Sequence, residues 1–117
     1  MHLHAGRFKG RVLLGPPAGS STRPITGLAK KSLFDTLADW MPEAVAVDLY
    51  CGTGSMGLEA LSRGARRVAF GEMDRRVLER LRRNIDAIGR SRRKVDHQLL
   101  SEITALDAHS TSFPISA

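Results

Sequence analysis

The pattern of apolar positions predicts alternating helices and strands through the middle of the chain. Segment 26–41 is amphipathic with helical spacing, Thr26 stands where a helix cap is expected, and Pro42 lies just past the end. A helix of this kind covers an apolar surface. The apolar positions that define its face are Leu33, Phe34, Leu37 and Met41.

Two short apolar runs, each followed by an amphipathic segment, predict two strand and helix units. The run 44–50 has the near-continuous apolar character of a strand buried on both faces of a parallel sheet, and a helix over 55–64 follows it. A second strand over 66–74 ends in acidic residues, and a helix over 74–89 follows with Asp74 as its cap. The apolar face of this last helix comprises Val77, Leu78, Leu81, Ile85 and Ile88.

The order strand, helix, strand, helix predicts parallel strands joined by right-handed crossovers. We therefore expect an α/β protein with a parallel β-α-β-α core over residues 43–94, preceded by a hairpin, a loop and a helix over 1–42. Residues 95–117 show a weak helical stretch around Leu99 to Leu106 and no convincing third strand, which predicts an irregular tail.

Charge is distributed unevenly along the 117 residues. All 18 basic residues fall within 1–94, where nine acids accompany them, whereas 95–117 holds three acids and no base. A cationic body of this size favours a polyanion such as nucleic acid, although a basic surface can also serve solubility alone. A single cysteine excludes an intramolecular disulfide, and no apolar run is long enough to span a bilayer, so we expect a cytoplasmic protein.

A glycine-rich segment joins the first predicted strand to its helix. It has the spacing Gly52-x-Gly54-x-x-Gly57, which in isolation is a weak signal for dinucleotide binding. Its position strengthens the signal, because glycines between a strand and a helix permit a tight turn, close approach of the backbone to a ligand and close contact of the helix with the sheet. A tight turn without a ligand is the simpler alternative.

Asp48 indicates which ligand this loop prefers. It falls at the C-terminal edge of the first strand, where open α/β sheets bind their ligands. A pyrophosphate there would be repelled by about 4 kcal/mol, for unit charges roughly 4 Å apart at an effective dielectric of about 20. S-adenosylmethionine carries an ammonium and a sulfonium and no phosphate, so it fits this carboxylate better. A role for Asp48 as a helix cap is the alternative, and one side chain can fill both roles.

Glu72 closes the second predicted strand, 20 residues after Gly52. An acid at this point can accept hydrogen bonds from a ribose. Both S-adenosylmethionine and NAD carry that ribose, so Glu72 predicts an adenosine-type nucleoside and leaves the choice between them to Asp48.

Three segments together resemble one family: TRPITGLAKKSLFDTL at 22–37, VDLYCGTGSMGLEALSRGA at 47–65 and VAFGEMDRRVLERLRRNIDAIG at 68–89. They are similar to the bacterial RsmD-type methyltransferases, which methylate a guanine amine of small-subunit ribosomal RNA with S-adenosylmethionine. The similarity covers about residues 5–90 and implies a partial Rossmann-like methyltransferase fold.

The resemblance also implies roles for individual residues, none of them catalytic or metal-binding. The residues implied to form the cofactor loop are Asp48, Gly52, Gly54 and Gly57, and Glu72 is implied to hold the ribose. A segment implied to lie over the cofactor and to face RNA contains Thr22, Arg23, Pro24 and Thr26.

Two features depart from the family's pattern. The family has acidic and basic residues just after the Thr-Arg-Pro stretch, where this chain has Gly27, Leu28, Lys30 and Lys31. The family also continues to an (Asp/Asn)-Pro-Pro-(Tyr/Phe) loop that grips the target amine, and these 117 residues contain no such sequence. We therefore expect a truncated member with weak or no turnover.

The basic residues fall into two groups. The group near the N-terminus, with no acid among the first 31 residues, is the expected RNA-phosphate surface. It comprises Arg7, Lys9, Arg11, Arg23, Lys30 and Lys31. The second group lies on and just beyond the helix over 74–89, where a charged outer face is what any amphipathic helix needs.

The leading hypothesis is a monomeric S-adenosylmethionine-dependent methyltransferase that acts on small-subunit ribosomal RNA or on a partly assembled 30S subunit, away from membranes. A non-catalytic, basic RNA-binding module is the first alternative. An NAD-dependent oxidoreductase is the second, and Asp48 disfavours it.

Overall fold

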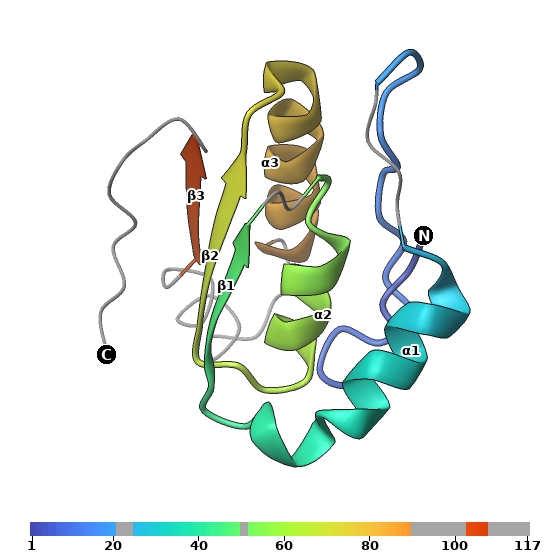
Figure 1. Cartoon of the computed structure of the whole chain (residues 1–117), viewed down its shortest axis with the longest axis vertical. Coiled ribbons are helices and arrows are strands. Elements are labelled where there is room, and N and C mark those ends of the chain that lie inside the picture. Colours follow the sequence, from blue (N-terminus) through green and yellow to red (C-terminus); the bar gives the residue numbers. More distant parts are fainter. Residues whose placement is uncertain (21–24, 50–51, 90–102, 108–117) are drawn as a thin grey trace.

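The computed structural model describes residues 1–20, 25–49, 52–89 and 103–107. Helices and strands alternate along the chain after an N-terminal segment of turns (Figure 1). The elements are helix α1 (Gly27–Thr36), a 3-10 turn (Ala38–Trp40), strand β1 (Val45–Leu49), helix α2 (Ser55–Ser62), strand β2 (Arg67–Glu72), helix α3 (Arg75–Gly89) and strand β3 (Ile103–Asp107). No helix among the described residues is long and apolar enough to cross a membrane.

The three strands form one parallel sheet in the order β1-β2-β3. The predicted β-α-β-α core is therefore confirmed. The prediction that no third strand follows is wrong, because Ile103–Asp107 pairs with β2, with Val68 opposite Ile103 and Glu72 opposite Asp107. Parallel pairing joins segments far apart in the sequence, so a short run of mixed polarity such as ITALD carries little local signal for it.

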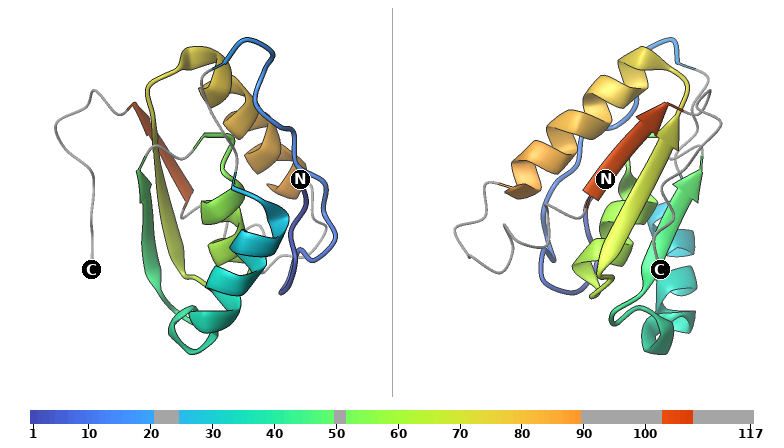
Figure 2. Two further views of the ribbon diagram at one scale, coloured as in Figure 1. Left: turned by 45° about the vertical axis from the view of Figure 1, so that its right-hand side comes forward. Right: turned by 90° about the vertical axis from the view of Figure 1, so that its left-hand side faces the viewer.

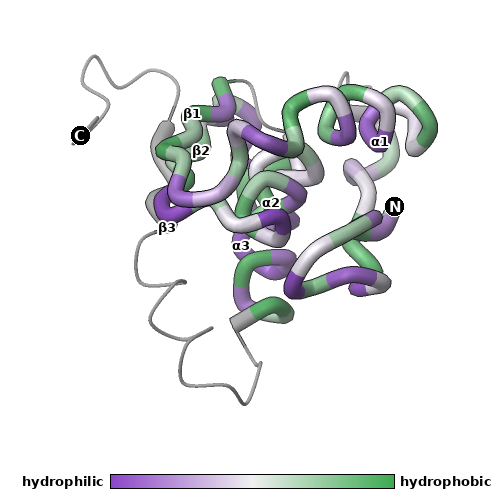
Figure 3. Tube along the Cα trace, turned by 90° about the horizontal axis from the view of Figure 1, so that it is seen from below, coloured by the Kyte–Doolittle hydropathy of each residue, from purple (hydrophilic) through white to green (hydrophobic). Residues whose placement is uncertain are grey.

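The helices gather on one side of the sheet (Figures 1 and 2). Helices α2 and α3 lie against the strands, and α1 packs with the N-terminal segment on the outer side of α2, as the view along the strands shows (Figure 3). The core between these layers combines residues from the N-terminal segment, α1, α2, β2 and α3. Its members include Leu3, Phe8, Leu13, Phe34, Leu58, Leu61, Val68, Phe70, Leu81 and Ile88.

Strand β1 is not buried on both faces, contrary to the prediction. It is an edge strand of the described sheet, and its side chains alternate between exposed and half-buried. Val47 is 39% exposed and Leu49 is 52% exposed, whereas Ala46 packs against the core. The apolar run fits a strand that α2 covers on one face only, because no described helix lies on the other.

The two predicted helix caps are confirmed, and the helical faces are confirmed in part. Thr26 Oγ1 accepts a hydrogen bond from the Ala29 amide at 3.2 Å, and Asp74 Oδ1 accepts one from the Arg76 amide at 2.9 Å. Helix α1 ends at Thr36, earlier than predicted, and buries Phe34 but leaves Leu33 exposed. On α3, by contrast, the predicted apolar face packs into the core as expected.

The N-terminal segment forms a small hairpin, which we define as residues 1–14. Its two arms are joined by backbone hydrogen bonds from Leu3 N to Arg11 O at 3.0 Å and from Leu13 N to Met1 O at 2.8 Å. The hairpin lies along α2, because the amide of Phe8 donates to Ser62 Oγ at 2.9 Å and the Ser62 hydroxyl donates to Ala5 O at 2.6 Å.

Candidate cofactor-binding site

The glycine loop, residues 52–57, lies at the carboxyl end of β1 and runs into α2. Gly54 caps α2 with φ 92°, and a Cβ there would stand 2.3 Å from Leu81 Cδ1, so no other residue fits without displacing the core. A Cβ on Gly57 would stand 2.2 Å from Phe70 Cε1 on β2. The predicted close contact between helix and sheet at Gly57 is therefore confirmed, while Tyr50 and Cys51 lie outside the described residues.

Asp48 extends from β1 to the first turn of α2. Its Oδ2 accepts a hydrogen bond from the Gly57 amide at 3.1 Å. This amide lies in the first turn of α2, where backbone amides have no acceptor within the helix. Burial raises the pKa of Asp48 to about 6, and the charge of Glu72 adds to this, while the bond from Gly57 opposes it. The helix-cap role is thus present, and the described residues bring no donor to the second oxygen.

Glu72 ends β2 beside the same loop. Its Oε1 accepts a hydrogen bond from the Gly52 amide at 3.0 Å, and its Oε2 accepts one from the Asp74 amide at 2.8 Å. These bonds hold the carboxylate against the start of the loop and leave each oxygen a further lone pair. The structure therefore brings Asp48, Glu72 and the glycine loop together at one edge of the sheet, as the sequence predicted.

A cavity of about 540 Å³ adjoins Glu72 at the start of α3. Its wall combines apolar and charged side chains: Glu72, Met73, Arg75, Leu78, Glu79 and Arg82. Met73 was not among the predicted site residues, and its side chain is about half exposed. A signal for it was available, because Met73 directly follows the strand-ending acid and so belongs to the same sheet edge.

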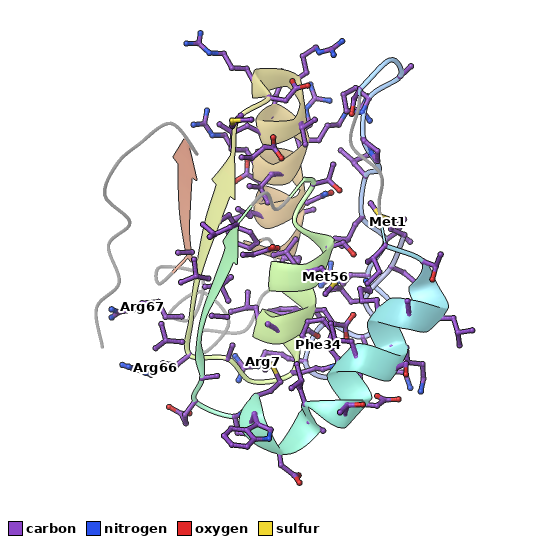
Figure 4. The ribbon with its side chains drawn as sticks, in the orientation of Figure 1. Met1, Arg7, Phe34, Met56, Arg66 and Arg67 are labelled. Atoms are coloured by element: carbon purple, nitrogen blue, oxygen red, sulfur yellow. The ribbon has the colours of Figure 1, made fainter. Side chains whose placement is uncertain are left out.

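The predicted RNA-phosphate group does not form one surface. Lys30 is only 2% exposed, so its prediction as a phosphate contact is wrong. Burial lowers the pKa of Lys30, and the nearby Glu59 carboxylate opposes this effect. Arg7 lies beside the last turn of α2, at the opposite end of that helix from the glycine loop, as Figure 4 also shows. Lys31 is exposed and paired with Asp35 at 2.7 Å.

Among the other predicted residues, Lys9 and Arg11 are exposed on the hairpin, and Arg23 lies outside the described residues. Thr26 is exposed, and its hydroxyl is engaged in the cap of α1. No hydrogen bond among the described residues joins Thr26 to the glycine loop.

The chain is similar in sequence and in fold to proteins already known. The ribosomal RNA small subunit methyltransferase D of Escherichia coli K12 is 39% identical over 80 residues, which are 68% of this chain and 40% of the relative. The structure of the Escherichia coli protein yhhF, which is named as a methyltransferase, superposes with a TM-score of 0.72 at 27% identity, over 92% of this chain and 53% of that one. The chain thus spans about half the length of these relatives or less.

A more distant likeness concerns the fold alone. The glycopeptide N-methyltransferase MtfA, solved with S-adenosylmethionine, superposes with a TM-score of 0.51 at 17% identity, over 81% of this chain and 34% of that one.

A family model described as Conserved hypothetical protein 95 matches residues 1–115. This match extends into residues 95–115, beyond the resemblance over about residues 5–90. The chain therefore belongs to this family, and its resemblance to the RsmD-type methyltransferases is confirmed.

Proposed function

We propose that the glycine loop binds S-adenosylmethionine. We further propose that the chain, when it is combined with a loop that grips the target base, transfers a methyl group to a guanine amine of small-subunit ribosomal RNA. The observation that carries the cofactor proposal is the position of Asp48, whose carboxylate holds the Gly57 amide at the start of α2.

The bond to Gly57 argues against a diphosphate as the ligand. In dinucleotide-binding proteins the amides at the start of this helix hold the pyrophosphate, aided by the helix dipole. Here a carboxylate already occupies one of those amides at 3.1 Å, so a phosphate would meet a negative charge where it needs a donor. A ligand with a cationic end gains from the same charge.

Glu72 and the neighbouring cavity fit the nucleoside end of the cofactor. The lone pairs left on Glu72 can accept from two ribose hydroxyls, and Met73 and Leu78 offer apolar surface for a flat base. When bound, S-adenosylmethionine would supply a methyl group on a positively charged sulfur. The residues of this chain would bind and orient it, since the transfer depends on alignment more than on a strong acid or base.

Calorimetric titration tests the cofactor proposal. Wild-type protein should bind S-adenosylmethionine and S-adenosylhomocysteine, and should not bind NADH. Asp48→Asn keeps an acceptor for Gly57 but removes the charge, so the Kd for S-adenosylmethionine should rise about tenfold, which corresponds to about 1.4 kcal/mol. Asp39→Asn, at an exposed acid on the 3-10 turn, is the matched control and should leave the Kd unchanged. Binding of NADH by the wild type would overturn the proposal.

For RNA, the proposed phosphate contacts are the exposed cations of the hairpin, Lys9 and Arg11, with Arg23 retained from the resemblance. Replacing Lys9 and Arg11 by Ala should weaken binding of a ribosomal RNA fragment and lower its salt dependence by one to two phosphate contacts. Methyl incorporation into that RNA, assayed with and without the second half of a full-length relative, tests the transfer step.

A further inference from the structure

Asn84, on α3, joins the N-terminal hairpin to the glycine loop. Its Oδ1 accepts a hydrogen bond from the Leu14 amide at 2.8 Å, and its Nδ2 donates to Leu14 O at 3.2 Å and to Thr53 O at 2.9 Å. The side chain is 2% exposed. One buried amide therefore pairs with both backbone groups of the hairpin's last residue and with a carbonyl of the loop.

Lys30, on α1, makes a second connection at the other end of the hairpin. Its ammonium donates to His2 O at 2.9 Å and to Ser55 Oγ at 2.9 Å, and it lies 3.5 Å from Glu59 Oε1. Ser55 is the first residue of α2 and directly follows the glycine loop's tight turn. Lys30 therefore bonds to groups inside the protein, which its position in the sequence did not predict.

The two connections meet on either side of Gly54. Thr53 and Ser55 flank this glycine, and both are buried. A Cβ on Gly54 would clash with Leu81, so the turn packs directly against the core. The shape of the loop is therefore fixed by side chains that also hold His2 and Leu14, the two ends of the hairpin.

Separating the hairpin from the core would break the hydrogen bonds that Asn84 makes with Leu14 and the one that Lys30 makes with His2. Asn84 Oδ1 would lose the donor described for it, and a buried polar atom without a partner is far more costly than the same atom in water. Asn84 and Lys30 each bond to the hairpin and to the loop with one side chain, so a shift of either side chain on undocking also changes its bond to Thr53 or Ser55.

We propose that Lys30 and Asn84 are positioning residues that couple the hairpin to the glycine loop, so that a polyanion bound to the hairpin and a nucleoside cofactor bound at the loop each strengthen the binding of the other. The proposal rests on the function proposed above for these two surfaces. Reciprocity is required by thermodynamics, and couplings of this kind are typically about 5-fold to 150-fold in affinity.

Amide hydrogen exchange by NMR tests the coupling, because two amides report on its two ends. The Leu14 amide, at the end of the hairpin, donates to Asn84, and the Gly52 amide, in the glycine loop, donates to Glu72 at 3.0 Å. In the wild type, saturating S-adenosylhomocysteine should slow exchange at Gly52 and, at a distance, at Leu14 by about 5-fold or more. Asn84→Ala should abolish the response at Leu14, and Ile88→Val, a mild change one turn further along α3, should retain it.

The outcomes separate this proposal from the cofactor proposal. Slower exchange at Gly52 without any change at Leu14 would overturn the coupling and leave cofactor binding intact. If calorimetry shows no binding of S-adenosylhomocysteine, the cofactor proposal fails, and the coupling is then tested by amide exchange in the ligand-free variants. Asn84→Ala should speed exchange at Gly52 more than Ile88→Val does, and equal exchange rates in the two variants would overturn the coupling.

Lys30 provides an independent variant if Asn84→Ala does not fold. Lys30→Met removes the donor to His2 and Ser55, and it should also speed exchange at Gly52, whereas Lys30→Arg should restore wild-type rates. Finally, the Kd for S-adenosylhomocysteine should fall when a ribosomal RNA fragment is present at saturation in the wild type. It should be insensitive to that RNA in Lys30→Met, and an equal response in both proteins would contradict the proposal.

Discussion

The two faces of the sheet differ in how strongly the rest of the molecule constrains them. On the face that α2 covers, Phe70 is fully buried and stands so close to Gly57 that the helix has no room for a side chain there. On the opposite face, Val47 and Leu49 of β1 are exposed, although they belong to an equally apolar run. An apolar sequence alone therefore does not tell which face of a strand is packed against the core. Substitutions on the two faces can measure how much each contributes to the free energy of unfolding.

The largest effect is expected at Phe70. Phe70→Ala removes a fully buried ring that touches the glycine loop's helix, so it should lower the free energy of unfolding by about 3–5 kcal/mol. Urea denaturation followed by circular dichroism measures this. A loss below about 1 kcal/mol would show that the covered face is no better packed than the open one.

Substitution of Glu59 tests the buried polar contacts that join α2 to the hairpin and to α1. This fully buried carboxylate accepts hydrogen bonds from His4 N at 2.9 Å and Arg63 Nε at 2.8 Å, and it lies beside Lys30. Glu59→Gln leaves the buried Lys30 without its counter-charge, so the protein should lose about 3 kcal/mol.

The pH dependence of this loss follows from the pKa of Glu59. Burial opposes ionisation, but the bonds from Arg63 and His4 and the charge of Lys30 hold the pKa below its usual range. A lowered pKa means that the ionised carboxylate stabilises the protein above about pH 4.5, and that this stability is lost as the pH falls through the lowered value. Denaturation at pH 7 and pH 3 should show the difference between wild type and Glu59→Gln shrinking in acid, and a constant difference would contradict the assignment.

Asp48 should behave in the opposite way. Burial raises its pKa from 3.8 to about 6, so the ionised form destabilises the protein without ligand by up to about 3 kcal/mol above pH 6. Asp48→Asn should consequently stabilise the ligand-free protein at pH 7.5, and this gain should vanish near pH 4. Thermal melting across this range measures it, and destabilisation at pH 7.5 would show that Asp48 is structural rather than held for a cationic ligand.

The smallest effect is expected on the open face. Val47→Thr changes an exposed position, so the free energy of unfolding should change by less than about 0.5 kcal/mol. Val68→Thr, the same substitution at a fully buried position of the neighbouring strand, should cost about 1–3 kcal/mol, because it buries a hydroxyl group. Equal losses at both positions would mean that the face bearing Val47 is covered in solution.

Much of the candidate site could be predicted because its signals are local. A glycine loop between a strand and a helix, with acids at the ends of two successive strands, leads directly to Asp48, Glu72 and Gly57 meeting at one sheet edge. The helix caps Thr26 and Asp74 could also be predicted from the sequence, because each accepts a hydrogen bond from an amide only two or three residues away. Lys30 was misjudged because its partners His2, Ser55 and Glu59 lie 25 to 29 positions distant.

The sequence by itself determined the order of helices and strands, the glycine loop and its two acids, because each depends on spacing over a few residues. Only the tertiary structure decided that β3 pairs with β2, that β1 has an open face, and that Lys30 and Asn84 link the hairpin to the loop. These features depend on which distant groups meet in the core, where burial makes an unpaired charge or amide costly enough to dictate its partner.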